Sequence, residues 1–151
     1  MIKQAVIPLA GLGTRMLPLT KALPKELWPL GNKSILEYIL DECFDAGITE
    51  VIFVISKNKE VIKKYFLRDK QLEKAVKNKS NILKTLLNLD KVSKKIKFVY
   101  QDKPKGLGHA VLCAQKLLKS KYFLLLLPDD VIKGSNCSKE LIAINKKKIP
   151  Q

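Results

Sequence analysis

Two glycines near the N-terminus are spaced so that the backbone could bind phosphate. Gly11 and Gly13 flank a single residue, Leu12, directly after a short apolar run. Because glycine carries no side chain, backbone N–H groups in such a turn can approach phosphate oxygens closely. Arg15 and Lys25 follow in the same loop and would add positive charge beside the phosphates. The combination favours a polyphosphate site over a glycine turn that binds no ligand.

Two well-known phosphate-binding motifs do not fit this loop. A dinucleotide-binding fingerprint requires a third glycine, in the pattern G-x-G-x-x-G, but Met16 stands in its place. We expect no helix directly after the glycines, because Pro18 and Pro24 interrupt the segment. A P-loop requires a Gly-Lys pair followed by a hydroxyl residue, and the segment lacks that sequence. The loop therefore belongs to another class of phosphate site.

A glutamine and a glycine later in the chain could bind a nucleotide base. Gln101 follows an apolar run, and Gly106 precedes a segment with helical spacing. A glutamine side chain offers one hydrogen-bond acceptor and two donors, which suits the edge of a pyrimidine. Gly106 would let the base or the ribose lie against the backbone. His109, the only histidine, is expected to pack in the first turn of that helix rather than to act as a catalytic base.

An acidic pair follows the last apolar run. Asp129 and Asp130 come directly after Pro128. A carboxylate beside a polyphosphate is a natural Mg²⁺ ligand, because Mg²⁺ prefers oxygen ligands and keeps several waters. The alternative is an aspartate that only initiates a turn or a helix. We expect Asp129 to be the metal ligand and assign no role to Asp130.

Strands and helices alternate along the chain. Short apolar runs predict strands at 2–9, 50–56, 96–101 and 122–127. Helical spacing predicts a helix capped by Ser34 and ended by Gly47, and further helices at 60–66, 72–89 (one or two), 106–118 and 138–147. This order indicates an α/β fold, Rossmann-like, with a largely parallel sheet and helices on both faces. Ligands bind at the carboxyl ends of strands in such sheets, and three of the four predicted strands end in the polar residues described above.

Length and charge limit the possible functions. A chain of 151 residues suits a single domain, and its net charge is +15. Most of the lysines are spread over 57–105 and 133–148, and Arg15 and Arg68 are the only arginines, which favours a solvated surface over a nucleic-acid reader. No apolar run is long enough to span a membrane. The three cysteines are far apart and suggest neither a disulfide framework nor a metal motif, as expected of a cytoplasmic protein.

The motifs together resemble a known family. The segment 11–15 with Pro24 and Lys25 is similar to the signature of sugar-1-phosphate nucleotidyltransferases. The longer segment 17–26 resembles that of the bacterial UTP–glucose-1-phosphate uridylyltransferases, and the similarity continues at 105–111 and 127–129. The resemblance implies the nucleotide-diphospho-sugar transferase fold, the substrates UTP and glucose 1-phosphate, and Mg²⁺ as cofactor. Partners of other kinds, nucleic acid and membrane, are not expected.

The resemblance also implies roles for individual residues. Arg15 and Lys25 would be catalytic: Arg15 would neutralise the β- and γ-phosphates, and Lys25 would reach the α-phosphate. Gln101 and Gly106 would recognise uracil, and Asp129 would hold Mg²⁺. Glu26 would lie beside the nucleotide, where its carboxylate could hold Lys25 or Lys21. The loop expected to cradle the nucleotide consists of Ala10, Gly11, Leu12, Gly13 and Thr14.

The chain departs from the family pattern in length. Complete members continue into further strands, which supply sugar-binding residues and a second carboxylate for Mg²⁺. We therefore expect 1–151 to be the nucleotide-binding N-terminal part of a nucleotidyltransferase domain, truncated, with an exposed sheet edge and with the C-terminal sugar-binding part absent. Its partner would be that missing half or a second copy of the chain. The alternatives are a non-catalytic UTP-binding remnant, a sister enzyme for another sugar or nucleotide, and a basic nucleic-acid-binding domain.

Overall fold

A four-stranded parallel sheet forms the centre of the computed structural model, which describes residues 2–132 and 134–148. Its strands are β1 (Gln4–Pro8), β4 (Glu50–Ile55), β5 (Ile96–Tyr100) and β6 (Leu124–Leu125), in the order β5-β4-β1-β6. Ala5 of β1 is in register with Val51 on one side and with Leu124 on the other. The chain thus builds outward from β1 in one direction and then crosses to its other side. This reversal makes the carboxyl ends of β1 and β6 a topological switch point.

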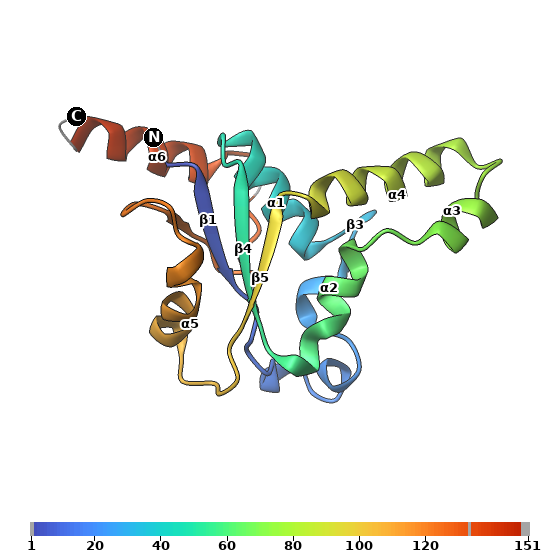
Figure 1. Ribbon diagram of the computed structural model, residues 1–151, viewed down its shortest axis with the longest axis horizontal. Coiled ribbons are helices and arrows are strands. Elements are labelled where there is room, and N and C mark those ends of the chain that lie inside the picture. Colours follow the sequence, from blue (N-terminus) through green and yellow to red (C-terminus); the bar gives the residue numbers. More distant parts are fainter. Residues whose placement is uncertain (1, 133, 149–151) are drawn as a thin grey trace.

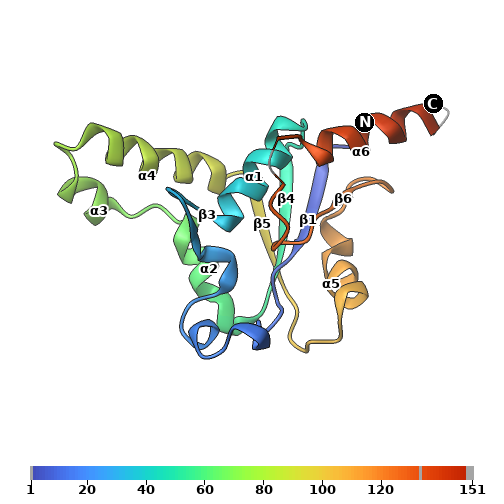
Figure 2. The same ribbon diagram turned by 180° about the vertical axis from the view of Figure 1, so that it is seen from behind.

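Helices cover both faces of the sheet (Figures 1 and 2). They are α1 (Ile35–Asp45), α2 (Glu60–Phe66), α3 (Lys70–Ala75), α4 (Ser80–Ser93), α5 (Leu107–Ala114) and α6 (Cys137–Lys148). Side chains alternate between the faces along each strand. Ile7 and Phe53 therefore pack with α1, α2 and α6, whereas Val6 and Ile52 pack with α5. The predicted α/β class with helices on both faces is confirmed.

The start of α1 follows the predicted capping pattern. The Ser34 hydroxyl accepts a hydrogen bond from the Glu37 backbone N–H at 3.3 Å. The Glu37 carboxylate in turn accepts one from the Ser34 backbone N–H at 2.9 Å. Gly47 adopts the left-handed conformation, with φ 88°, just after the helix ends. A cap of this kind contributes about 1 kcal/mol, and it fixes where the chain leaves the loop that carries the predicted site.

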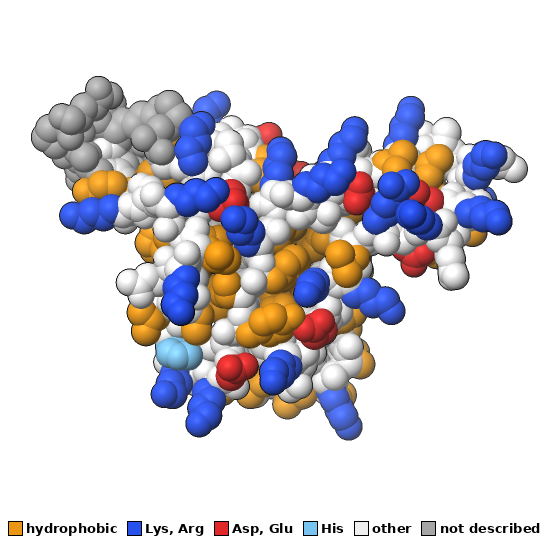
Figure 3. All heavy atoms as spheres, viewed as in Figure 1, with side chains coloured by type: hydrophobic (Ala, Val, Ile, Leu, Met, Phe, Trp, Pro, Cys, Tyr) orange, Lys and Arg blue, Asp and Glu red, His pale blue; other side chains and the backbone are white. Residues whose placement is uncertain are grey.

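The lysine-rich segment predicted at 72–89 forms two helices, α3 and α4. None of their residues is fully buried, and they extend away from the sheet (Figure 1). Lysine and arginine side chains are spread across the face shown in Figure 3 rather than gathered into one stripe. This distribution agrees with the interpretation of the charge as a solvated surface.

Three elements differ from the prediction. The strand predicted at 122–127 is regular only over β6, which pairs with β1 at two positions and forms an edge of the sheet. The helix predicted at 106–118 ends at Ala114 and continues as a 3-10 turn over Gln115–Leu117. The segment between the predicted strand at 2–9 and the helix capped by Ser34, for which no regular element is predicted, contains short 3-10 helices and leads into a small hairpin of β2 (Pro29–Leu30) and β3 (Lys33–Ser34).

The surface beside β6 is partly apolar. Leu125 and Leu127 are 40% and 44% exposed, as expected for an uncovered sheet edge. Within 2–132 and 134–148, the structure contains no helix with the length and apolar character that crossing a bilayer requires.

Candidate functional site

A cleft of about 360 Å³ opens at the carboxyl ends of β1, β5 and β6. This is the switch point at which ligands bind in sheets of this kind. Its floor is formed by apolar residues such as Leu107 and Ala110 of α5. Seven of the predicted site residues line it: Ala10, Gly11, Lys25, Glu26, Gln101, Gly106 and Asp129. The fold thus brings together residues from three separate segments of the sequence.

An ion pair joins two sides of the cleft. Lys25, on the 3-10 helix Lys25–Leu27, donates a hydrogen bond from Nζ to Oδ2 of Asp129, which follows β6, at 2.6 Å. The side chains are 23% and 42% exposed, so both remain reachable from solvent. The hydrogen bond from Lys25 holds the pKa of the Asp129 carboxyl below its ordinary value of 3.8, and the charge of Arg15 acts in the same direction. A bound phosphate would compete with Asp129 for the Lys25 ammonium group.

The glycine loop is held in shape by Thr20. Gly13 has φ 64°, a left-handed conformation that disfavours any side chain. An added Cβ would lie 3.0 Å from the Thr20 Cγ2 atom, and the Thr20 hydroxyl donates a hydrogen bond to the Gly13 carbonyl at 2.9 Å. Gly13 is therefore required by both its backbone angle and its neighbour.

The rest of the glycine loop lies outside the lining of the cleft. Leu12, Thr14 and Arg15 are exposed, and Arg15 lies on the 3-10 helix Thr14–Met16. The charge of Arg15 reaches Asp129 without a direct hydrogen bond among the described residues. The structure therefore places only Ala10 and Gly11 of the predicted cradle in the cleft wall. The nucleotide contacts predicted for all of these loop residues stay predictions.

The carboxylate of Glu26 has a different partner from those predicted. Instead of Lys25 or Lys21, Glu26 binds Lys59, whose Nζ lies 2.7 and 2.9 Å from the two carboxylate oxygens. Both side chains are buried, 1% exposed for Glu26 and 9% for Lys59. Lys59 ends the 3-10 helix Lys57–Lys59 after β4, so the pair ties the loop after β1 to the end of the neighbouring strand. Sequence reasoning missed Lys59, because nothing in its spacing separates it from the other lysines.

The side chain of Gln101 is held by two acceptors. Its Nε2 lies 3.2 Å from the Gly106 carbonyl oxygen and 2.9 Å from Nδ1 of His109. Gln101 is only 5% exposed. His109 lies in the first turn of α5, as predicted, and its ring contacts the predicted base-reading residue. Gly106, with φ 85°, precedes the helix in a conformation that favours glycine.

The acidic side chains of the cleft suit a metal ion that phosphates help to hold. Among the residues that the structure describes, no three His, Cys, Asp or Glu side chains gather as a metal cage. Glu26 is buried in its pair with Lys59, whereas the Asp129 carboxylate, although paired with Lys25, is 42% exposed and can be reached by a cation. Mg²⁺ accepts this arrangement, since it is commonly bound by one or two carboxylates together with substrate phosphates and water. Asp129 therefore fits as a single Mg²⁺ ligand.

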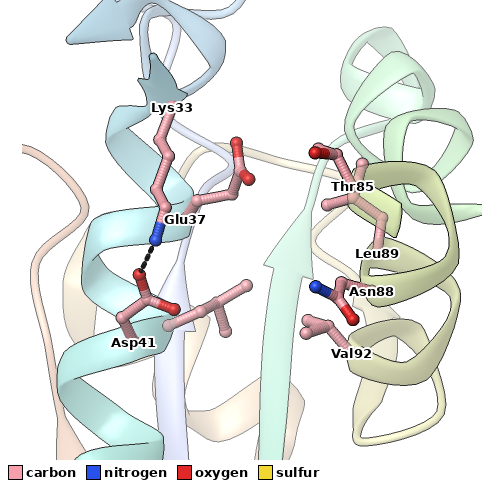
Figure 4. A pocket seen from close by; sticks show the side chains of 8 residues that line it. Lys33, Glu37, Asp41, Thr85, Asn88, Leu89 and Val92 are labelled. Atoms are coloured by element: carbon pink, nitrogen blue, oxygen red, sulfur yellow. Dashed lines mark hydrogen bonds and ion pairs between the residues drawn. The ribbon is translucent and has the colours of Figure 1, made fainter. Parts of the chain in front are cut away.

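A second hollow lies between α1 and α4 (Figure 4), with a volume of about 200 Å³. Lys33 reaches across the end of α1 to Asp41, with Nζ 2.6 Å from Oδ2. Glu37, also in its wall, accepts hydrogen bonds from Ser34 and Tyr65. The α4 side contributes Asn88, Leu89 and Val92. The charged side chains that line this hollow thus already have partners, and the hollow contains none of the residues predicted to bind a nucleotide.

Comparison with known proteins identifies the family of this chain. The sequence profile of the nucleotidyl transferase family matches residues 4–149. The chain belongs to this family. Among curated nucleotidyl transferases, it is 42% identical over 138 residues to the UTP–glucose-1-phosphate uridylyltransferase of Bacillus subtilis (strain 168), covering 88% of this chain and 46% of that protein. It is 41% identical over 133 residues to the enzyme of the same name from Escherichia coli (strain K12), covering 87% of this chain and 44% of that protein.

Solved structures of the same family share the fold. A UTP-bound UGPase from Acinetobacter baumannii superposes with a TM-score of 0.86 at 37% sequence identity, over 97% of this chain and 53% of that one. A UDP-glucose pyrophosphorylase complexed with UDP-glucose gives a TM-score of 0.80 at 33% identity, over 98% of this chain and 54% of that one. This nucleotidyl transferase chain spans about half the length of the relatives it matches.

Proposed function

We propose that this chain is the nucleotide-binding part of a nucleotidyltransferase that forms UDP-glucose and pyrophosphate from UTP and glucose 1-phosphate. The observation that carries the proposal is the convergence of Lys25, Gln101 and Asp129 on one cleft at the switch point of the sheet. A relative that is 42% identical to this chain is named for this reaction, and related solved structures hold UTP or UDP-glucose.

The reaction requires chiefly positioning and charge neutralisation. A sugar-phosphate oxygen attacks the α-phosphorus of UTP, the bond to the β-phosphate oxygen breaks, and pyrophosphate leaves. The attacking oxygen is already anionic, so no general base is needed, in agreement with the placement of His109 beside Gln101. Lys25 would release Asp129 and bind the α-phosphate and the incoming sugar phosphate. Arg15, at the rim, would stabilise negative charge on the leaving pyrophosphate.

A metal ion would complete the charge balance. When bound, Mg²⁺ would neutralise phosphate charge. Asp129 would hold it, with the remaining positions taken by phosphate oxygens and water. The low pKa of the Asp129 carboxyl supports this role, since the group is ionised at neutral pH.

The base and the sugar make different demands on this chain. Gln101 and Gly106 would bind uracil, and the backbone of Ala10 and Gly11 would lie against the nucleotide. Because the chain spans about half the length of its relatives, we propose that residues outside it complete the sugar site, from a further polypeptide segment or a second subunit. A reducing, cytoplasmic location is supported by three free cysteines.

Complementation tests the proposal. The chain would be mixed with the C-terminal half of the Bacillus subtilis relative, and UDP-glucose formation measured by chromatography. We expect turnover in the mixture and a loss of about two orders of magnitude with Lys25→Ala. Binding of UTP without turnover in any mixture would favour a non-catalytic nucleotide-binding role instead. Turnover that survives Lys25→Ala would remove Lys25 from the catalytic role.

A further inference from the structure

The amide group of Gln101 is fixed in one of its two orientations. The Gly106 carbonyl oxygen lies 3.2 Å from the Gln101 amide nitrogen and can only accept a hydrogen bond. An amide turned by half a rotation would place two oxygens against each other there. The carbonyl itself is held by α5, since it also accepts a hydrogen bond from the Ala110 backbone N–H at 3.2 Å. The amide nitrogen of Gln101 therefore faces the Gly106 carbonyl oxygen.

This orientation determines the tautomer of the neutral His109 ring. The second hydrogen of the Gln101 amide nitrogen points to Nδ1 of His109, at 2.9 Å. Nδ1 must then accept, so the proton of the neutral ring is on Nε2. With both amide hydrogens used, the Oε1 atom of Gln101 is the part of the side chain left for a ligand.

The oxygen of Gln101 needs a donor from outside the chain. Gln101 is 95% buried and lines the cleft, yet no described residue donates a hydrogen bond to its Oε1. Ser56 Oγ is the one fully enclosed side-chain atom without a partner in the described part of the chain, so Oε1 is still reachable from the cleft. Buried polar atoms are almost always hydrogen-bonded. Water can donate to Oε1 in the free protein, and a ligand in the cleft can take its place with a donor of its own.

We propose that His109 determines base specificity by holding Gln101 so that an acceptor faces the base. Uracil and thymine present an N–H group at N3, which Oε1 can accept. Cytosine presents an acceptor at N3, which Oε1 would repel. His109 contacts Gln101 but is not among the residues that line the cleft, so it acts as a positioning residue through Gln101. The inference rests on the proposed function, because it requires that a pyrimidine bind at this cleft.

Two substitutions at the same position separate positioning from packing. His109→Phe keeps an aromatic ring but removes the acceptor, leaving one amide hydrogen of Gln101 unpaired. His109→Asn keeps an acceptor close to the place of Nδ1. Leu112→Ala, at an exposed site on the same helix, is the control for effects on α5.

The measurement is calorimetric titration of the 151-residue chain with UTP and with CTP, each with Mg²⁺. The unmodified chain should bind UTP more tightly than CTP by about tenfold or more, the usual cost of opposing an unpaired buried group. His109→Phe should reduce this ratio by about tenfold, whereas His109→Asn and Leu112→Ala should retain it. A packing defect alone would weaken both nucleotides and leave the ratio unchanged.

Each outcome has a distinct meaning. If the unmodified chain binds neither nucleotide, the proposed function and this inference both fail. If it prefers UTP and His109→Phe keeps the same preference, only this inference fails. A second readout needs no substitution, because nitrogen-detected NMR of the histidine ring reports which nitrogen carries the proton. The inference requires a neutral ring protonated on Nε2, and a neutral ring protonated on Nδ1 would overturn it.

Discussion

Lys25 and Asp129 are 104 positions apart in the sequence, yet the Lys25 ammonium nitrogen lies 2.6 Å from a carboxylate oxygen of Asp129. The contact exists because β6 adds to the sheet beside β1, so the loops after these two strands meet. A cation for phosphate and a carboxylate for a metal ion are thereby held next to each other before any ligand binds. The pair neutralises itself in the free protein and would separate when a nucleotide and its metal ion enter.

Removing Lys25 should raise the pKa of Asp129. In the folded chain the carboxyl titrates below its ordinary value of 3.8, first because Lys25 donates a hydrogen bond to it. The stabilisation from this pair is present above the ordinary pKa and is lost as pH falls through the depressed one. It is small, about 1 kcal/mol or less, because the pair is partly exposed. Carbon-13 NMR titration of the Asp129 carboxyl should show a higher pKa in Lys25→Met, and an unchanged value would refute the contact.

Replacing the buried Lys59 should destabilise the fold far more than replacing the exposed Lys57. Lys59→Met leaves the buried Glu26 carboxylate without a partner, a loss of about 3–5 kcal/mol. Lys57→Met, at an exposed position of the same turn, should change the free energy of unfolding by less than about 0.5 kcal/mol. Urea unfolding followed by circular dichroism measures both.

The same pair allows a compensation test. Lys59→Met leaves the buried Glu26 charge without a partner, and Glu26→Gln removes that charge. The double variant should therefore be more stable than Lys59→Met alone. Replacing both members of a buried pair is often much less costly than breaking it. Additive losses in the double variant would mean that the two side chains do not interact in solution.

Replacement by alanine should destabilise the protein at Gly13, which is left-handed, but not at Gly11. Gly13→Ala forces φ near +64° on a residue with a Cβ and brings that atom to 3.0 Å from Thr20. The expected loss of stability is about 1–2 kcal/mol. Gly11→Ala meets no atom within 4 Å and should leave the unfolding midpoint nearly unchanged. Equal effects of the two substitutions would contradict the assigned loop conformation.

Much of this fold could be predicted from periodicity alone. The central strands β1 and β4 are apolar on both faces, and α2 has the predicted bounds, 60–66. The carboxyl ends of parallel strands meet at one edge, so the meeting of Gln101 and Asp129 near the glycine loop also followed from the sequence. Local patterns are informative where a single face or strand determines the structure.

What could not be predicted depends on contacts that form only when the chain folds. Lys59 follows β4 and Glu26 follows β1, and only the pairing of these strands brings them together. The orientation of Gln101 depends on a carbonyl and a ring nitrogen of α5, which have no sequence signature. The two-residue length of β6 is not explained by its edge position, since β5 at the opposite edge has five residues.

Calorimetric titration of the chain with UTP, dTTP, GTP and ATP in the presence of Mg²⁺ tests the central claim most directly. We predict saturable binding of UTP at one site, weaker binding of the purine nucleotides, and a marked loss of UTP affinity in Gln101→Ala and Lys25→Ala. Equal affinity for all four nucleotides, or UTP binding that survives both substitutions, would contradict the assignment of this cleft.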